Sequence, residues 1–145
     1  MICLAVIDTN VLVSALLSAH EDAATVQVLE RMLSGEITPV YSSSILAEYR
    51  EVLHRERFGF RTQTVDYLVS AIEKFGVPVE PAPSEVELPD PKDLPFYAVV
   101  MEKREDGAYL VTGNLKHYPP RRFIVTPAEM LAILEEKGII PAKNP

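Results

Sequence analysis

One stretch near the start of the chain decides the fold: ICLAVIDTN, at residues 2–10. Its first six residues are apolar or cysteine, a run too short for an amphipathic helix and typical of a strand buried on both faces. Asp8 follows this strand, and the sequence VLVSALL at residues 11–17 then predicts a helix. Ligands of open parallel α/β sheets bind at the carboxyl ends of the strands. Asp8 is therefore either a helix N-cap or a functional carboxylate, and this stretch alone leaves both interpretations open.

Outward from this stretch, strand-like and helix-like segments alternate along the chain. Further strands are predicted at residues 38–41, 77–79, 108–112 and 123–125, and helices at 22–33, 45–53, 62–74, 95–106 and 127–137. An acidic loop with five prolines occupies residues 81–95. Such alternation predicts an α/β protein whose parallel sheet is covered by helices on both faces. We expect one domain at residues 1–137 and a loosely held C-terminal tail at residues 138–145.

Composition and charge limit the classes of protein to which this chain can belong. No apolar run is long enough to span a membrane and no signal peptide precedes the first strand, so a cytoplasmic protein is expected. Cys3 is the single cysteine, which excludes an internal disulfide. The net charge of −7 does not favour nucleic-acid binding, which normally requires a basic face. Two local clusters of basic residues are either solvated surface or phosphate contacts: Arg50, Arg55, Arg57 and Arg61, and then Lys116, His117, Arg121 and Arg122.

Four polar residues fall at comparable places in this pattern. Asp8 follows the first strand, Glu48 lies in the helix after the second, Asp93 (with Asp90 nearby) opens the helix after the proline-rich loop, and Asn114 follows the fourth strand. Taken singly, each has a structural explanation as a helix cap, a dipole partner or a turn residue. Because strand ends and the starts of the following helices share one edge of a parallel sheet, all four are expected to meet there.

Carboxylates that lie close together repel one another and need a counterion. Two carboxylates about 5 Å apart repel by roughly 3 kcal/mol at an effective dielectric constant of about 20. Because the expected donors are all oxygens, with neither cysteine nor histidine beside them, the cation is expected to be hard, either Mg²⁺ or Mn²⁺. Such ions activate water and stabilise the displacement at a phosphodiester. The pattern therefore predicts a metal-dependent nuclease.

The chain also resembles the PIN-domain proteins, and among them the VapC-like ribonucleases that are toxin components of toxin–antitoxin pairs. Four pieces in order carry the resemblance: VIDTNVLVSA at residues 6–15, SILAEYREVL at 44–53, DPKDLPF at 90–96 and YLVTGNLKH at 109–117. The resemblance implies a three-layer α/β/α sandwich around a parallel sheet and Mg²⁺- or Mn²⁺-dependent cleavage of single-stranded RNA. It also implies a homodimer and a cognate antitoxin protein as partner.

By position, the resemblance makes Asp8, Glu48 and Asp93 the metal ligands, with Asn10 and Thr112 as supporting residues. Asn114 completes the catalytic set but departs from the family pattern, because many members carry an aspartate there. The lost negative charge puts a second metal and full catalytic strength in question.

Arg50, Lys116 and His117 are candidates for holding the RNA backbone. A first alternative function is a catalytically weak or inactive PIN-like domain that binds RNA or protein. A second is a phosphatase with Asp8 as nucleophile. The second is disfavoured because Asn10 stands where that chemistry usually has another acid.

Overall fold

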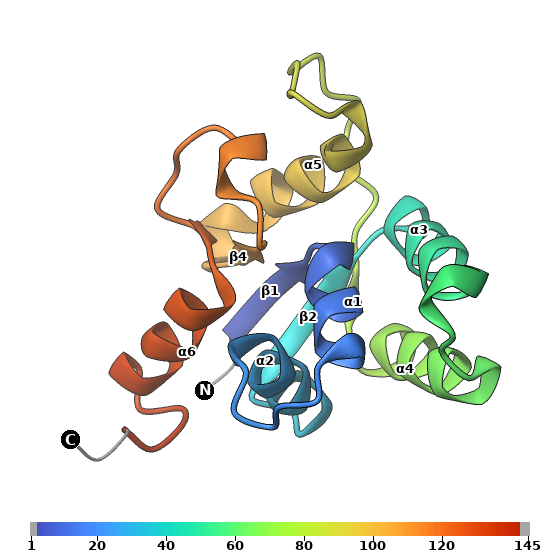
Figure 1. Ribbon diagram of the computed structural model, residues 1–145. Coiled ribbons are helices and arrows are strands. Elements are labelled where there is room, and N and C mark those ends of the chain that lie inside the picture. Colours follow the sequence, from blue (N-terminus) through green and yellow to red (C-terminus); the bar gives the residue numbers. More distant parts are fainter. Residues whose placement is uncertain (1–2, 143–145) are drawn as a thin grey trace.

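The predicted first strand lies at the centre of the sheet. In the computed structural model, which describes residues 3–142, the strands form one five-stranded parallel sheet in the order β3-β2-β1-β4-β5 (Figure 1). Their bounds are Cys3–Ile7 for β1, Ile37–Tyr41 for β2, Val77–Pro78 for β3, Tyr109–Val111 for β4 and Ile124–Val125 for β5. Ile2, expected to begin the first strand, and residues 143–145 of the expected tail lie outside the described residues.

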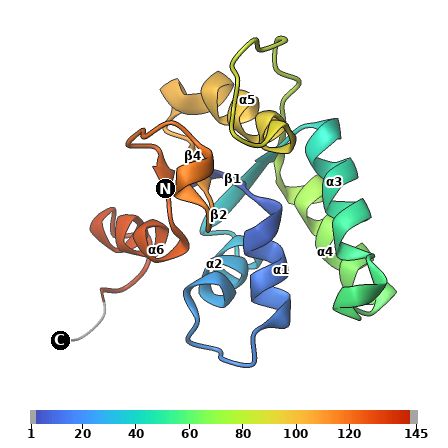
Figure 2. The same ribbon diagram turned by 45° about the horizontal axis from the view of Figure 1, so that its top comes forward.

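Six helices flank this sheet in the described part of the chain, as α1 (Thr9–Leu17), α2 (Ala24–Leu33), α3 (Ser43–Leu53), α4 (Thr62–Phe75), α5 (Leu94–Lys103) and α6 (Pro127–Glu136). Figure 2 shows the sheet between α5 on one side and α1 and α2 on the other. The pair α3–α4 and the helix α6 lie toward the two ends of the sheet (Figure 2). The predicted α/β fold with a covered parallel sheet is therefore confirmed, and it is a three-layer α/β/α sandwich.

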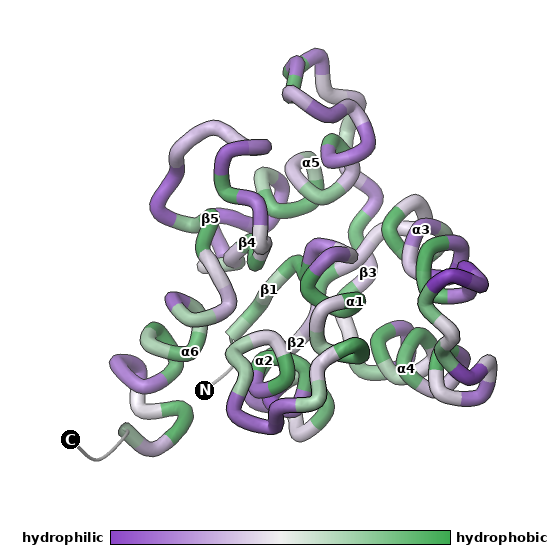
Figure 3. Tube along the Cα trace, in the orientation of Figure 1, coloured by the Kyte–Doolittle hydropathy of each residue, from purple (hydrophilic) through white to green (hydrophobic). Residues whose placement is uncertain are grey.

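Burial explains why the first stretch forms the central strand. Ala5, Val6 and Ile7 are at most 1% exposed, although successive side chains of a strand point to opposite faces. Both faces of β1 are thus covered, and Figure 3 shows β1 as a hydrophobic segment. The most hydrophilic segments in that view include the loop before α5 and the connection from β4 to β5.

The strand order places a topological switch point at the carboxyl end of β1, between β1 and β4, and we call this position the crevice. The chain leaves β1 to form β2 on one side, and it returns later to form β4 on the other. Ligands of open α/β sheets bind at such a switch point, outside the carboxyl ends of the strands. The Asp8 backbone N–H donates to Val111 O at 2.9 Å, so the pairing of β1 with β4 extends to the first residue beyond the strand. Asp8 is fixed at the mouth of this crevice.

Two helix starts agree with the sequence in detail. Ser42 caps α3 through its side chain, and Thr126 and Glu129, in the sequence TPAE at residues 126–129, form a capping box at the start of α6. After α6 the chain turns at Gly138, and Ile140 is buried with 7% exposure. Residues 138–140 thus pack against the core, while the domain boundary at residue 137 stays a prediction. Within the described residues, no helix is both long and apolar enough to cross a membrane.

Candidate functional site

Asp8 is the most buried carboxylate of the candidate site, with 4% of its surface exposed. Its Oδ2 accepts hydrogen bonds from the Thr112 hydroxyl and the Tyr118 hydroxyl, each at 2.9 Å. Its Oδ1 accepts only a long bond, 3.5 Å, from the backbone N–H of Asn10. Asp8 does occupy the N-cap position of α1, but its best hydrogen bonds come from the other side of the crevice. Asp8 is therefore the N-cap of α1 and also remains a candidate functional carboxylate.

Burial raises the pKa of the Asp8 carboxyl, because a charged group loses its hydration there. The hydrogen bonds from Thr112 and Tyr118 oppose this rise by stabilising the charged form. Among the described residues, no lysine or arginine forms an ion pair with Asp8. The fold thus holds a buried carboxylate with hydrogen-bond donors around one oxygen and no lysine or arginine counterion.

Glu48 reaches the crevice from the second turn of α3 and is half-buried. The macrodipole interpretation fails here, because that effect is confined to the first turn of a helix. Its Oε2 accepts a hydrogen bond from the Thr9 hydroxyl. The pKa of Glu48 is raised, first by burial and then by the negative charges of Asp8 and Asp93. The three carboxylates are therefore close enough for their charges to interact.

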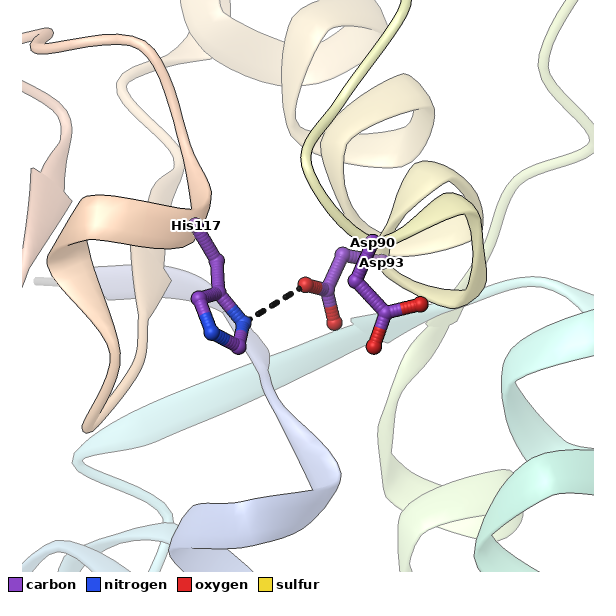
Figure 4. Close-up of side chains that lie close together, drawn as sticks. All are labelled: Asp90, Asp93 and His117. Carbon is purple, nitrogen blue, oxygen red and sulfur yellow. Dashed lines mark hydrogen bonds and ion pairs between the residues drawn. The ribbon is translucent and has the colours of Figure 1, made fainter.

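Asp93 ends the 3-10 turn η2 (Pro91–Asp93) and precedes α5. It stands at the N-cap position of α5, yet its side chain makes no capping hydrogen bond. Instead, Asp93 Oδ2 lies 3.1 Å from His117 Nδ1 (Figure 4). Burial and the charge of Asp8 raise the pKa of Asp93, and His117 opposes the rise. Asp93 therefore occupies the N-cap position without a capping hydrogen bond, and its carboxylate contacts His117 instead.

His117 also completes a group of potential metal ligands. One ligand atom each of Asp90, Asp93 and His117 lies within 4.8 Å of the others (Figure 4). The expectation that no histidine lies beside the acids is therefore wrong. A 3-10 turn that the sequence pattern did not reveal, η4 (Leu115–His117), follows β4 and directs the imidazole toward the start of α5. The donors here include a nitrogen as well as carboxylate oxygens.

The supporting residues Asn10 and Thr112 take part in hydrogen bonds that join Asp8, the start of α1 and the loop after β4. Thr112 donates to Asp8 through its hydroxyl, and the same oxygen accepts from the Asn114 backbone N–H at 3.0 Å. The Asn10 side-chain oxygen accepts from the Gly113 backbone N–H at 3.2 Å. Asn10 and Thr112 thus tie the loop after β4 to the start of α1. The Asn114 side chain forms no hydrogen bond with the described residues, so its amide is not committed to the turn.

The three predicted carboxylates keep oxygens free for a cation, but the described residues whose ligand atoms lie within 4.8 Å of one another are Asp90, Asp93 and His117 rather than Asp8, Glu48 and Asp93. Each of the three carboxylates has one oxygen bonded to a protein donor: Oδ2 of Asp8, Oε2 of Glu48 and Oδ2 of Asp93. The second oxygen of Glu48 and that of Asp93 accept no hydrogen bond from the described residues, and that of Asp8 accepts only the long one. A cation would satisfy these oxygens and neutralise the charges that raise the pKa values.

The three candidate RNA contacts lie in different surroundings. Arg50 forms an ion pair with Glu73 of α4 at 3.3 Å, so its charge is already partnered. His117 contacts Asp93, as described above. Lys116 is exposed in η4 and forms no ion pair with the described residues. Of these three residues, Lys116 is therefore the one whose charge has no partner among the described residues and is available to a phosphate.

Sequence reasoning missed Thr9, whose hydroxyl donates to Glu48, and Tyr118, which donates to Asp8 beside the Thr112 hydroxyl. Thr9 directly follows Asp8 in the chain, and this position could have identified it as a candidate site residue. Tyr118 has no such signal, because its hydroxyl meets Asp8 only after η4 has turned the chain. Burial and the nearby carboxylates of Asp8 and Asp93 raise the pKa of Tyr118 far above its ordinary value, so Tyr118 remains a donor.

We expect Tyr118→Phe to lower the free energy of unfolding by about 1–2 kcal/mol at neutral pH, since Asp8 then loses a hydrogen bond to its charged form. The loss should shrink at about pH 4, where a protonated Asp8 depends less on that donor. Urea unfolding at both pH values measures this, with Tyr67→Phe, an exposed tyrosine, as control. A loss that does not change with pH would contradict a bond to ionised Asp8.

The comparison with protein families agrees with this geometry. The family model for the PIN domain matches residues 5–116, which include the last three residues of β1, the whole of β4 and all four predicted site positions. The chain therefore belongs to the PIN-domain family, whose fold is of the nuclease type. No curated protein matches the chain significantly.

Proposed function

We propose that this protein is a metal-dependent endoribonuclease that cleaves single-stranded RNA. The observation that carries the proposal is the convergence of Asp8, Glu48 and Asp93: after burial, the charges of Asp8 and Asp93 raise the pKa of Glu48, and the charge of Asp8 raises the pKa of Asp93. Such a cluster opposes folding unless it binds protons or a cation. Membership of the PIN-domain family supports the cation, because a nuclease-type fold uses one.

In this proposal Asp8, Glu48 and Asp93 hold the cation, and Asn10 and Thr112 keep the first of them in place. The cation, when bound, neutralises charge that develops on the phosphate during displacement. Glu48 and Asp93 orient the attacking water. Asn114 supports the site as an uncharged amide.

The cation is Mg²⁺ or Mn²⁺ in this proposal. The carboxylate oxygens suit both ions. An imidazole nitrogen within 4.8 Å of two carboxylate oxygens favours Mn²⁺, which accepts nitrogen ligands more readily than Mg²⁺ does. Mn²⁺ is therefore the ion to test first.

Cleavage of a single-stranded RNA should require a divalent ion and stop when a chelator is added. Mn²⁺ should restore it at a lower concentration than Mg²⁺. The measurement is the cleavage rate of a labelled RNA in a titration of each ion after chelation, with a duplex RNA as the substrate control. Cleavage that resists the chelator would contradict the mechanism.

The alternative is a PIN-like domain with weak or lost catalysis that binds RNA or protein. Asn114 favours it, because an amide stands where a fourth carboxylate would strengthen cation binding. RNA binding without cleavage in Mn²⁺ would decide for this alternative. The phosphatase has less support, since the Asn10 side chain accepts a bond from Gly113 and provides no second acid.

The cellular role is also a proposal. We place the protein in the cytoplasm as the toxin of a toxin–antitoxin pair, acting as a homodimer and held inactive by a cognate antitoxin. The resemblance of the four quoted segments supports this role. Arrest of growth on expression, relieved by a protein encoded beside it, would support the toxin role, and its absence would leave a ribonuclease without that role.

A further inference from the structure

A concave surface of about 650 Å³ lies beside the carboxylates, on the connection from β4 to β5 and the start of α6. We call it the basic groove and define it by the residues that the argument uses: Lys116, Tyr118, Pro119, Pro120, Arg121 and Arg122. Figure 3 shows this connection as one of the hydrophilic segments of the chain. Its residues come from a single stretch of sequence, so their proximity does not depend on distant packing.

The basic groove and the candidate site share Tyr118. Tyr118 lines the groove and donates its hydroxyl to Asp8 at 2.9 Å. Lys116, another lining residue, precedes His117, whose imidazole lies 3.1 Å from Asp93. The groove is therefore linked to the carboxylates through Tyr118 and the turn η4.

The charges of the groove are available to a ligand. Lys116, Arg121 and Arg122 form no ion pair with any described residue, and the Arg121 guanidinium donates only to the carbonyl of Pro120. Glu129 is the acid in the lining, and its Oε1 already accepts the Thr126 backbone N–H at 2.9 Å in the capping box. In a protein of net charge −7, three unpaired cations here form a local positive surface.

The shape of the groove suits nucleotides. Pro119 and Pro120 have fixed φ angles and no N–H, so they hold the loop in one conformation and present an apolar surface between the cations. Alternating apolar and cationic surface matches the alternating bases and phosphates of a single strand. A second groove of similar volume beside Thr9 and Asn10 has Arg57 as its one lining cation, stacked 4.8 Å from the Phe58 ring centroid. Phosphates therefore favour the basic groove.

We propose that the basic groove binds the single-stranded RNA that flanks the scissile phosphate. Lys116, Arg121 and Arg122 contact the phosphates of the nucleotides that leave the site, and the two prolines pack against their bases or riboses. The inference rests on the proposed ribonuclease function and assigns the direction in which the substrate leaves the carboxylates.

The test compares two double charge reversals that change the net charge equally: Arg121→Glu with Arg122→Glu, and Lys74→Glu with Arg104→Glu outside both grooves. Binding of a fluorescent 12-nucleotide RNA is followed by anisotropy over a range of salt, with Asp8→Asn present in all proteins to prevent cleavage. Each lost phosphate contact should lower the salt slope by about 0.7, so the groove variant should lose about 1.4 and bind about 25-fold more weakly at roughly 0.1 M salt.

Cleavage with Asp8 intact separates the two proposals. A dinucleotide is too short to fill the groove, so the groove variant should cleave it at the wild-type rate while its KM for the 12-nucleotide RNA rises. Equal RNA binding by the two double variants would overturn the groove inference and leave the ribonuclease intact. Unchanged RNA binding with lost binding of poly-glutamate would instead make the groove an interface for an acidic protein. If wild-type protein cleaves neither RNA, the ribonuclease proposal itself fails.

Discussion

Asp8→Asn is expected to abolish RNA cleavage, by a factor on the order of 1,000, while leaving the protein folded. Asparagine keeps an acceptor oxygen for the Thr112 and Tyr118 hydroxyls. Its amide NH₂ replaces Oδ1, whose one bond from a described residue is the long contact from the Asn10 backbone. What disappears is the negative charge offered to the cation. The variant therefore separates the chemistry of the site from its packing.

The measurement is the cleavage rate in Mn²⁺, together with the melting temperature in a chelator. Asp22→Asn, an exposed aspartate of the loop before α2, serves as the control for a lost surface charge. The control should cleave at the wild-type rate. An Asp8 variant that unfolds would show that the carboxylate has a structural role. One that folds and still cleaves at the wild-type rate would show that cleavage does not need the carboxylate.

The same variant should change the pH dependence of stability. Raised pKa values of Asp8, Glu48 and Asp93 mean that the folded protein binds protons more tightly than the unfolded chain does. In a chelator, their contribution to the free energy of unfolding is therefore full below their ordinary pKa values of about 4 and is lost as pH rises. Urea unfolding across this range should show a steeper fall for wild type than for Asp8→Asn. An identical fall for both proteins would contradict the raised pKa of Asp8.

Asn114→Asp should tighten Mn²⁺ binding about tenfold and raise cleavage when Mn²⁺ is limiting. A further carboxylate about 5 Å from a divalent ion adds roughly 1.5 kcal/mol of attraction even at the dielectric constant of water. The Asn114 side chain forms no hydrogen bond with the described residues, so the substitution breaks none. Without metal, the same charge should lower the melting temperature by repulsion, and Mn²⁺ should reverse that loss.

Calorimetric titration of Mn²⁺ and melting curves with and without the ion test this expectation. Gln63→Glu adds the same charge on the exposed surface of α4 and is the matched control. If Asn114→Asp behaves like this control in metal affinity, melting and cleavage, Asn114 lies outside the metal site and is only a turn residue.

The fold could be predicted because its signals are local. A short apolar run gives a strand buried on both faces, as at Ala5–Ile7, and the capping box at Thr126 marks the start of α6. The ends of these elements also placed Asp8 and Asp93 at one edge of a parallel sheet, since that edge collects strand ends and helix starts. Glu48 followed because its helix begins directly after β2.

The remaining site residues could not be predicted because their positions depend on turns without a periodic signal. The 3-10 turn η4 decides that His117 meets Asp93 and that Tyr118 meets Asp8, and a three-residue turn leaves no repeat in the sequence. The wrong expectation about histidine arose here, since no helix or strand is predicted between the strands at residues 108–112 and 123–125. Spacing predicts where a strand ends, but it does not predict which way the next side chains face.

The ends of the sheet have a consequence for self-association. The edge strands β3 and β5 pair over two residues each, and Pro78 in β3 has no N–H to offer. Edges this short give a second chain almost nothing to extend by strand addition, and they also protect the protein against aggregation through its sheet. The proposed dimer would therefore not be built by extending the sheet. Tyr67 and Phe75 on α4, each 69% exposed, are the large hydrophobic side chains with which such an assembly would begin.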